Sequence, residues 1–215
     1  MQVQRKTLTQ LSIPICFETL FYMLSGMVDT LMLSSVSDQA VGAVGTANTY
    51  ISVFIIMFGV ISSGMVAVMT QNIGAGKKSR AWKGFYTAII TGCSVGIIIF
   101  MVGFFGGGVL SSFFTNDSEV IAQSAAYLKG FSADCILTCV LFSSIGYFNG
   151  CGKSIPVMIQ GITSAFCIRI PVSIIMSRLP ETSLTYVGMA TPITTVYGII
   201  FFVICFRLLN KNSAK

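Results

Sequence analysis

Four acidic or basic side chains lie well inside long apolar stretches of this 215-residue chain, where a charge is costly. Glu18 and Asp29 lie in the first stretch, Asp134 in the fourth and Arg169 in the fifth. A charge at the centre of a bilayer costs at least about 3 kcal/mol on insertion scales. We therefore expect these groups to face a protein interior, where they pair, take up a proton or bind a cation. The pattern predicts a pathway for ions or solutes across a membrane.

The two acids of the first stretch are expected to share one face of a helix. Glu18 and Asp29 are eleven residues apart, which at 100° per residue is three turns plus about 20°. Tyr22 and Ser25 fill the steps between them. Such a polar stripe is typical of the wall of a wet cavity, and we assign the two acids to cation or proton coupling and Tyr22 and Ser25 to the substrate pathway. The alternative is that both acids form structural hydrogen bonds only.

Depth in the membrane groups three of the charges into one layer. Asp29, Asp134 and Arg169 fall about five to eight residues inside the outer ends of their stretches, or roughly 8 to 12 Å by helical rise. Asp134 and Arg169 either share a hydrated coupling site or form a structural ion pair, and Asp29 is then the freer acid. Asn48 extends the predicted substrate pathway with Arg169, although such polar groups often only join helices. Other polar residues of the stretches are Ser52, Ser62, Ser63, Gln160, Thr163, Ser164, Thr191, Thr194, Thr195 and Tyr197.

The apolar stretches themselves predict an all-α membrane protein. A hydrocarbon core of about 30 Å requires about 20 helical residues, and only closed backbone hydrogen bonding is tolerated there. The sequence predicts one domain, residues 1–215, built as a six-helix transmembrane bundle. The expected spans are roughly 11–35, 46–71, 84–110, 121–148, 155–177 and 184–208.

Charges in the loops predict the orientation of the bundle. Basic residues occupy the N-terminus, the second and fourth loops and the C-terminal tail, whereas the acids occupy the first, third and fifth loops. The positive-inside rule places both termini in the cytoplasm, in a multi-pass protein of the cell membrane. The bases of the first set are Arg5, Lys6, Lys77, Lys78, Arg80, Lys83, Lys153, Arg207, Lys211 and Lys215, and the second set has the acids Asp38, Asp117, Glu119 and Glu181 against the single base Arg178.

Composition excludes several other classes of protein. A chain with 54% hydrophobic residues, 9% charged residues and a mean hydropathy of +0.84 has too little polar surface for a water-soluble globule. The net charge of +6 lies in membrane-flanking loops, where lipid and orientation explain it without nucleic acid. The chain has no histidine, and no motif of a hydrolase, metalloprotease or nucleotide-binding enzyme is present. We expect no enzyme activity, no metal site and no disulfide among the seven cysteines.

Glycine and proline residues predict local features of the spans. Gly92 and Gly96 have the GxxxG spacing that lets helices approach closely, and the glycine run 106–108 is expected to fray the outer end of the third span. Pro171 and Pro192 lie inside the fifth and sixth expected spans, where each removes a backbone donor and is expected to kink its helix.

Four segments resemble transporters of the multidrug and toxic compound extrusion (MATE) family. They are IPICFETLFYMLSGMVDTLMLSSVSDQAVGAVGTAN (13–48), TQNIGAGKKSRA (70–81), GYFNGCGKSIPVM (146–158) and the stretch from Arg169 to Pro192. The resemblance implies that Asp29, the acid of VDT, lies in the cation or proton site of the first lobe. The family's second lobe carries an acid in its fourth helix, at a position matching Thr138 here. Asp134 lies one turn away on the same face.

The resemblance also implies a full transporter twice this size. MATE proteins have twelve helices in two lobes, whereas this chain has six expected helices. Its opening resembles the first lobe, and the segments from about Thr70 onward resemble the second. The chain is thus expected to be a fragment, a fusion across an internal deletion, or a half-size protein that pairs with a second copy or with another MATE lobe.

The function that this resemblance implies is secondary antiport. The expected substrates are drugs and other amphipathic organic compounds, exported in exchange for Na⁺ or H⁺, with no cofactor other than the coupling ion and with membrane lipids as surroundings. The alternative is a non-transporting remnant or an assembly subunit of a full-length transporter. A channel is a weaker third option, because no filter-like loop repeats along the chain.

Overall fold

A computed structural model of the protein describes residues 12–17, 19–21, 38–177 and 188–213, together with Thr9, Met23, Leu24, Met27 and Thr185. All regular structure in this described part is helical. The predicted all-α fold is therefore confirmed. Its elements are α2 (Asp38–Gly74), α3 (Lys78–Ser112), α4 (Ser118–Ser132), α5 (Asp134–Gly150), α6 (Ser154–Thr163), the π-helix η1 (Ser164–Arg169), α7 (Ile170–Ser177) and α9 (Ala190–Ser213).

The helices have the length and composition of membrane spans. Four helical segments of the described part are long and apolar enough to cross a membrane, and the bent pair α4 and α5 gives a fifth. The helices α2 and α3 contain 37 and 35 residues, or about 55 and 52 Å of helical rise, so both extend well beyond a hydrocarbon core of about 30 Å. The first expected span, 11–35, lies mostly outside the described residues, so the count of six spans stays a prediction.

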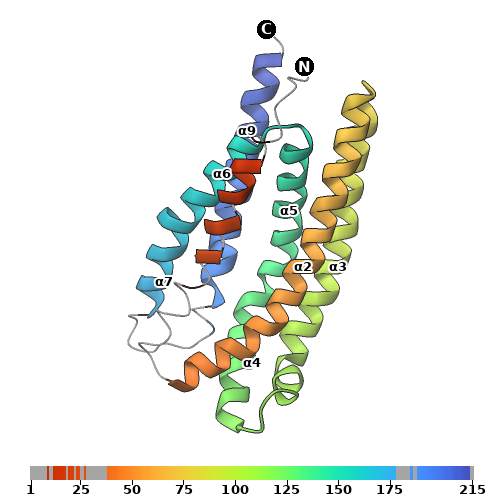
Figure 1. Ribbon diagram of the computed structural model, residues 1–215. Coiled ribbons are helices and arrows are strands. Elements are labelled where there is room, and N and C mark those ends of the chain that lie inside the picture. Colours follow the sequence, from red (N-terminus) through yellow and green to blue (C-terminus); the bar gives the residue numbers. More distant parts are fainter. Residues whose placement is uncertain are drawn as a thin grey trace.

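Alternate turns of the chain lie at opposite ends of the bundle (Figure 1). The turns between α2 and α3 and between α5 and α6 lie at one end together with the C-terminal end of α9, whereas the turn between α3 and α4 lies at the other end. The first group carries the basic loops and the second the acidic loop that contains Asp117. The charges are therefore sorted by end of the molecule, as the positive-inside argument requires.

Two turns at the basic end are built in the same way. The sequences Gly-Ala-Gly-Lys and Gly-Cys-Gly-Lys follow α2 and α5, and their central glycines, Gly76 and Gly152, have φ of +71° and +70°. The amide of Lys77 donates to the Asn72 carbonyl, and that of Lys153 donates to the Phe148 carbonyl, each at 2.8 Å. This left-handed ending satisfies the last carbonyls of both helices and requires glycine.

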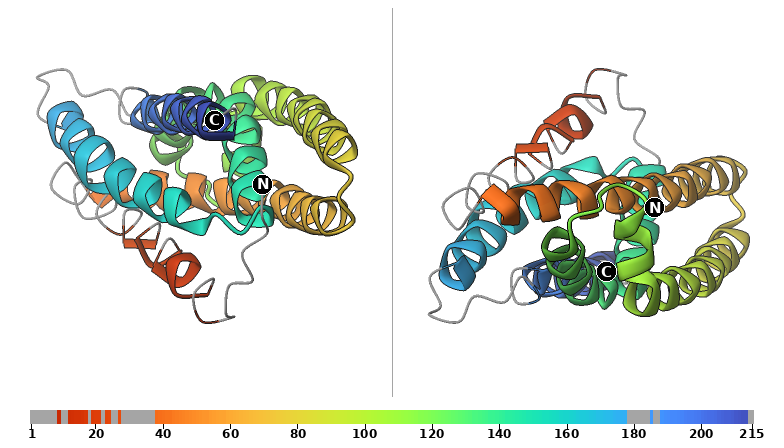
Figure 2. Two further views of the ribbon diagram at one scale, coloured as in Figure 1. Left: turned by 90° about the horizontal axis from the view of Figure 1, so that it is seen from above. Right: turned by 90° about the horizontal axis from the view of Figure 1, so that it is seen from below.

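The helices divide into a close-packed group and a second group that leans against it. The helix α2 packs against α3, α4 and α5, and α3 packs against α4 and α5. The helices α6, η1 and α7 pack mainly against one another and against α9, and both α9 and α6 pack on α5. Seen along the bundle in Figure 2, α3 and the α6 to α7 segment therefore lie on opposite sides of the molecule.

Glycines let α3 and α5 approach closely. A Cβ at Gly96 would lie 2.8 Å from both the Cys135 carbonyl oxygen and the Cys139 sulfur, and a Cβ at Gly92 would lie 3.2 Å from the Cys139 Cβ. The predicted packing role of the GxxxG pair is confirmed. The expected fraying at the run 106–108 is wrong, because α3 continues as a regular helix to Ser112. Its middle glycine packs on Ala125 of α4, which holds this end of the helix in place.

An aromatic cluster closes the basic end of the bundle. Trp82 and Phe85 of α3, Tyr147 of α5 and Phe206 of α9 have ring centroids 4.8 to 5.9 Å apart. Rings at such separations add to the energy of apolar burial. The cluster ties α9, the last helix, to the close-packed group.

Irregular backbone lies beside Pro171, as predicted, and also at a break that no proline marks. The predicted span 121–148 is broken at Ala133, where α4 and α5 meet at 48°. No proline lies there, but Gly130 and Ser132 do, and the Ser132 hydroxyl donates to the Leu128 carbonyl at 2.6 Å, a bond that bends helices. Pro171 follows the π-helix η1. Pro192 is the third residue of α9, where a proline is tolerated, and the residues that precede α9 are described only in part, so the predicted kink there stays a prediction.

Candidate functional site

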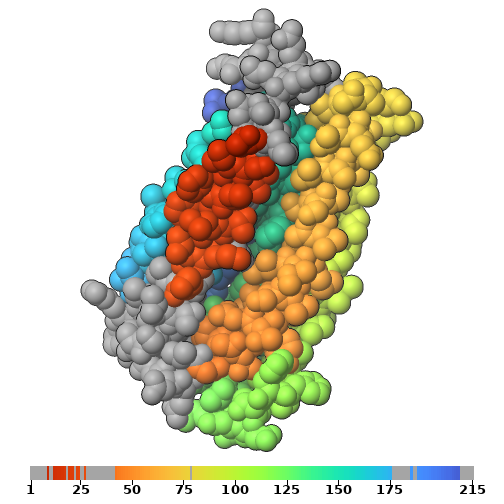
Figure 3. Space-filling model, viewed as in Figure 1, coloured from red at the N-terminus to blue at the C-terminus, as the bar shows by residue number. Residues whose placement is uncertain are grey.

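A cavity of about 680 Å³ lies between the two groups of helices. Its walls come from α2, α4, α5, α6, η1 and α9, and from Ile15 and Thr19 of the first apolar stretch. In the space-filling view the described residues of Ser12–Phe21 lie over the gap between α2 and the α6 to α7 segment (Figure 3). The volume is within the range of about 300 to 1,000 Å³ that is typical of sites for small organic molecules.

One face of α5 forms the back wall of this cavity. Asp134, Thr138, Leu141, Ile145 and Asn149 all line it. Their spacing of four, three, four and four residues is the spacing of a single helix face. By helical rise this face runs about 22 Å, from the break after α4 to the basic end of the bundle. The cavity is therefore a long chamber with two different ends.

Asp134 is the buried acid of the outer end. Only 2% of its surface is exposed. The Thr138 hydroxyl, one turn further along α5, donates to its Oδ2 at 2.8 Å, and the Thr195 hydroxyl of α9 interacts with the same carboxyl. No described group hydrogen-bonds to Oδ1, which is itself buried. An orphaned carboxylate oxygen at this depth requires a proton or a cation.

The helix break gives Asp134 part of its electrostatic support. Asp134 is the first residue of α5, so its carboxyl lies at the positive end of that helix dipole. An unbroken helix from α4 into α5 would remove this support, because the freed amides would be bonded within the helix.

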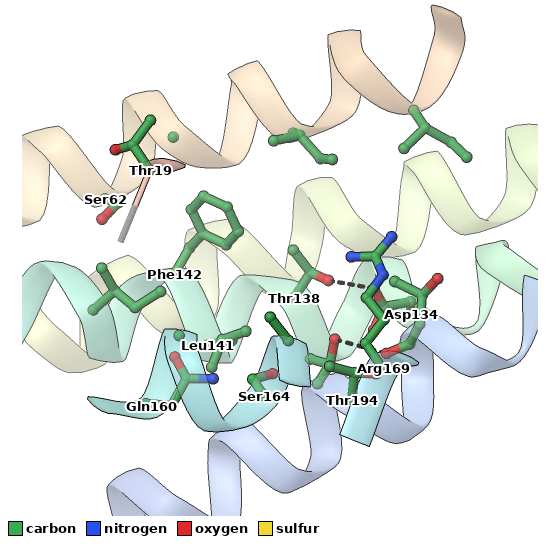
Figure 4. A pocket seen from close by; sticks show the side chains of 18 of the residues that line it. Thr19, Ser62, Asp134, Thr138, Leu141, Phe142, Gln160, Ser164, Arg169 and Thr194 are labelled. Atoms are coloured by element: carbon green, nitrogen blue, oxygen red, sulfur yellow. Dashed lines mark hydrogen bonds between the residues drawn. The ribbon is translucent and has the colours of Figure 1, made fainter. Parts of the chain in front are cut away.

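Arg169 lies at the end of the π-helix and shares this end of the cavity. It lines the cavity, and its positive charge acts on the Asp134 carboxyl. Figure 4 shows the two side chains close together, with Thr194 of α9 beside them. The wide turn has a local cause: Pro171 has no amide hydrogen and its ring would clash with the Cys167 carbonyl, whereas the amide of Ile170 reaches back five residues to Ala165.

The inner part of the cavity is polar but carries no charge among its described residues. Gln160 of α6 lines it with 4% of its surface exposed, and Ser62 of α2 and Asn149 of α5 also line it. The Asn149 Oδ1 is buried without a hydrogen-bond partner in the described part of the chain. Figure 4 shows Gln160 and Ser62 at the opposite end of the view from Asp134 and Arg169.

Apolar side chains line the rest of the chamber. Ile51 and Ile55 of α2, Phe131 of α4, and Leu141 and Phe142 of α5 all contribute. Large apolar walls with a few placed polar groups are suited to an amphipathic organic molecule. Among the described residues, no group of three or more His, Cys, Asp or Glu side chains has the arrangement of a metal site.

The structure brings together three of the residues that the sequence assigned to the site. Asp134, Arg169 and Asn48 all line the cavity. The other four assigned residues, Glu18, Tyr22, Ser25 and Asp29, lie outside the described residues. Their neighbours Ile15 and Thr19 line the cavity, and the roles of the four stay predictions.

Several lining residues were missed or undervalued from the sequence. Thr138 and Asn149 were not predicted as pathway residues, although their spacing from Asp134 places them on its helix face. Gln160, Ser164, Thr194 and Thr195 also line the cavity, whereas the sequence favoured a role for each in joining helices. Tyr197 does have that joining role, because its hydroxyl donates to the Thr163 hydroxyl at 2.8 Å and ties α9 to α6.

Comparison with known proteins places this chain in a family. The family model described as MatE matches residues 14–175, which is most of the chain. The chain belongs to the MatE family. It is 28% identical over 213 residues to the "Uncharacterized transporter YisQ" of Bacillus subtilis, covering 96% of this chain and 45% of that protein. It is 27% identical over 209 residues to the "Probable multidrug resistance protein NorM" of Thermotoga maritima, covering 90% of this chain and 42% of that protein.

Solved MATE structures have the same fold. The structure described as MATE in the bent conformation superposes with a TM-score of 0.84 at 17% identity, covering 91% of this chain and 43% of that one. An inward-facing MATE transporter of the MOP superfamily gives a TM-score of 0.79 at 18% identity, with 93% and 45% covered. The MatE chain described here thus spans a little under half the length of the relatives it matches. It is an integral membrane protein that resembles one MATE lobe.

Proposed function

We propose that this MatE chain forms one lobe of a secondary antiporter of the cell membrane, which exports drugs and other amphipathic organic compounds in exchange for Na⁺ or H⁺. The observation that carries the proposal is the orphaned carboxylate oxygen of Asp134, buried beside a chamber of about 680 Å³ with mostly apolar walls. The chamber has room for an organic molecule, and the acid supplies a place for a coupling ion. One relative is named as a transporter and another as a probable multidrug resistance protein, which supports the same function.

Coupling follows from competition for the acids. A buried carboxylate is stabilised by a proton, a small cation or a cationic substrate, and one carboxyl cannot hold two of these at once. Binding of the ion would therefore displace a cationic substrate, and binding of the substrate would displace the ion. Asp134 fits this role by its surroundings, while Asp29 and Glu18 are assigned to it from the sequence. Asn48, Arg169, Tyr22 and Ser25 are assigned to the substrate pathway.

A chain of half the relatives' length needs a second lobe for alternating access. We propose a homodimer with both termini in the cytoplasm, because two copies in one orientation reproduce a pair of parallel repeats. Pairing with another MATE lobe would meet the same need. The second candidate function is a non-transporting remnant or assembly subunit, favoured by the half length alone.

The experiment is efflux of ethidium, a fluorescent lipophilic cation, from cells that lack their own exporters and express this chain alone. Wild-type efflux that Asp29→Asn and Asp134→Asn each abolish at equal expression would support the antiporter. Glu119→Gln is the matched control, because this acid is exposed at the outer end and lies away from the cavity. No efflux from a well-expressed wild-type chain would favour the remnant or subunit.

A further inference from the structure

The inner part of the chamber presents the amide of Gln160, whose hydrogen-bonding groups remain available. Gln160 is 4% exposed and lines the cavity. Its side chain forms no hydrogen bond within the part of the chain that the structure describes. Unlike Asp134 Oδ1 and Asn149 Oδ1, the amide atoms of Gln160 are not sealed off from the chamber, so a ligand or water inside the chamber can supply their hydrogen bonds.

Packing around Gln160 keeps this side chain in place. A Cβ at Gly198 of α9 would lie 2.7 Å from the Gln160 Nε2 and 2.8 Å from the Leu141 Cδ1. Glycine at this position therefore leaves the space that the amide occupies. The nearby hydrogen bond from Tyr197 to Thr163 fixes α6 against α9. A side chain positioned in this way loses little conformational entropy when a ligand binds to it.

Gln160 is also separated from the charged end by a fixed distance. It lies at the level of Leu141, which is seven residues, or about 10 Å of helical rise, from Asp134 along α5. The wall between the two levels includes the apolar side chains of Leu141 and Phe142 (Figure 4). A molecule that reached both ends would need a charged group, an apolar middle about 10 Å long and an uncharged hydrogen-bonding group.

We propose that Gln160 forms a second ligand subsite, which selects elongated amphipathic cations that end in an uncharged hydrogen-bonding group. The amide both donates and accepts, so it matches a carboxamide, which does the same. Asp134 holds the cationic group at the other end of the chamber. This inference deepens the proposed function and rests on it for the identity of the substrates, but it concerns binding and is tested without transport.

The test uses two synthetic probes of equal length. Both carry a trimethylammonium group on a chain of eight methylenes, and one chain ends in a primary carboxamide whereas the other ends in an isopropyl group of similar shape. Affinities are measured by isothermal titration calorimetry with the purified full chain in nanodiscs, and empty nanodiscs are subtracted to remove partition into lipid. One net hydrogen bond predicts roughly 2- to 10-fold tighter binding of the carboxamide probe to wild type.

Gln160→Met is the decisive variant, because it keeps the length of the side chain and removes the amide. We expect the ratio of the two affinities to fall to about one. Gln123→Met is the matched control: it removes the same group from α4, away from the cavity, and should keep the wild-type ratio. Fluorescence of Trp82, within the aromatic cluster, reports whether each variant is folded.

Each outcome decides the proposal. Equal binding of the two probes to wild type would overturn it even if a variant failed to fold, and so would binding of neither probe or a ratio that survives Gln160→Met. A preference for the carboxamide that is lost only in Gln160→Met supports the subsite. If that preference is found in a chain that exports nothing from cells, the antiporter proposal fails and the subsite stands.

Discussion

The two faces of α5 differ in what surrounds them. On one face Cys135 and Cys139 contact the α3 glycines so closely that no Cβ fits between the helices. On the other face Asp134, Thr138 and Asn149 line an open chamber, and two of these side chains keep a buried oxygen without a partner. One face therefore supplies stability and the other carries unsatisfied groups that suit a ligand. Changes on the two faces should have separable effects.

The largest expected effect is on the chamber face. Asp134→Asn keeps the shape of the side chain and removes its charge, so binding of a cation at the outer end should weaken at least 10-fold, in line with the worth of a charged hydrogen bond. The midpoint of thermal unfolding should stay close to that of wild type. Calorimetric titration with the trimethylammonium probes and a melting curve of the same sample measure both. A variant with a clearly lower melting midpoint but wild-type affinity for the probes would reverse the assignment of the two faces.

The next largest effect is on the packed face. Gly96→Ala places a methyl group 2.8 Å from the Cys135 oxygen and the Cys139 sulfur, and overpacking of this kind costs about 1 to 3 kcal/mol. The melting midpoint should fall, and probe affinity in the surviving folded protein should change little. Gly108→Ala is the control, because no atom lies within 4 Å of the added methyl. Equal stability of the two variants would contradict the close packing of α3 on α5.

A smaller effect is expected from the wide turn that positions Arg169. Pro171→Ala restores an amide donor and removes the clash with the Cys167 carbonyl, which allows η1 to relax into a regular α-helix. Arg169 would then rotate relative to Asp134, and affinity for the cationic probe should change by a few fold. Pro192→Ala, in the first turn of α9, should have no such effect. Identical affinities in wild type and Pro171→Ala would show that the proline does not set the site.

The smallest effect concerns thiol reactivity at the inner end of α5. Burial raises the pKa of the Cys151 thiol, against the opposing effects of the Tyr147 hydrogen bond and the positive charge of Lys153. A raised pKa leaves less thiolate at neutral pH, so alkylation by a maleimide should be slow at pH 7 and speed up as the pH rises toward the thiol pKa. A cysteine introduced on the chamber face by Asn149→Cys should react with the maleimide faster than Cys151 does at pH 7. Equal rates would mean that the two positions are equally accessible.

Most of the fold follows from patterns that a single sequence contains. Long apolar runs predict α2, α3 and α9, and the GxxxG spacing of Gly92 and Gly96 predicts a close helix contact. The break before Asp134 was not predictable in this way, because no proline marks it. Gly130 lies beside the break, and an added Cβ there would meet the Thr185 and Gly188 backbones far along the chain. Contacts between distant segments leave no local signal.

The candidate site was predictable only in part, for the same reason. Asp134 and Arg169 stand out because a charge in an apolar stretch is costly. Gln160 and Asn149 carry no charge, so nothing in the sequence distinguishes them from the amides that join helices in many membrane proteins. Their role depends on the absence of a partner, which is visible only once α6 and α9 are placed in space.

The most direct test of the account is transport by the purified chain alone in proteoliposomes. Vesicles would be loaded with ethidium and given an inward gradient of Na⁺ or of protons, and ethidium release would be followed by fluorescence for wild type, Asp134→Asn and Glu119→Gln. The account predicts gradient-driven release by wild type and Glu119→Gln, and none by Asp134→Asn. Release that does not respond to either gradient, or that persists in Asp134→Asn, would contradict a coupled antiporter built on this chamber.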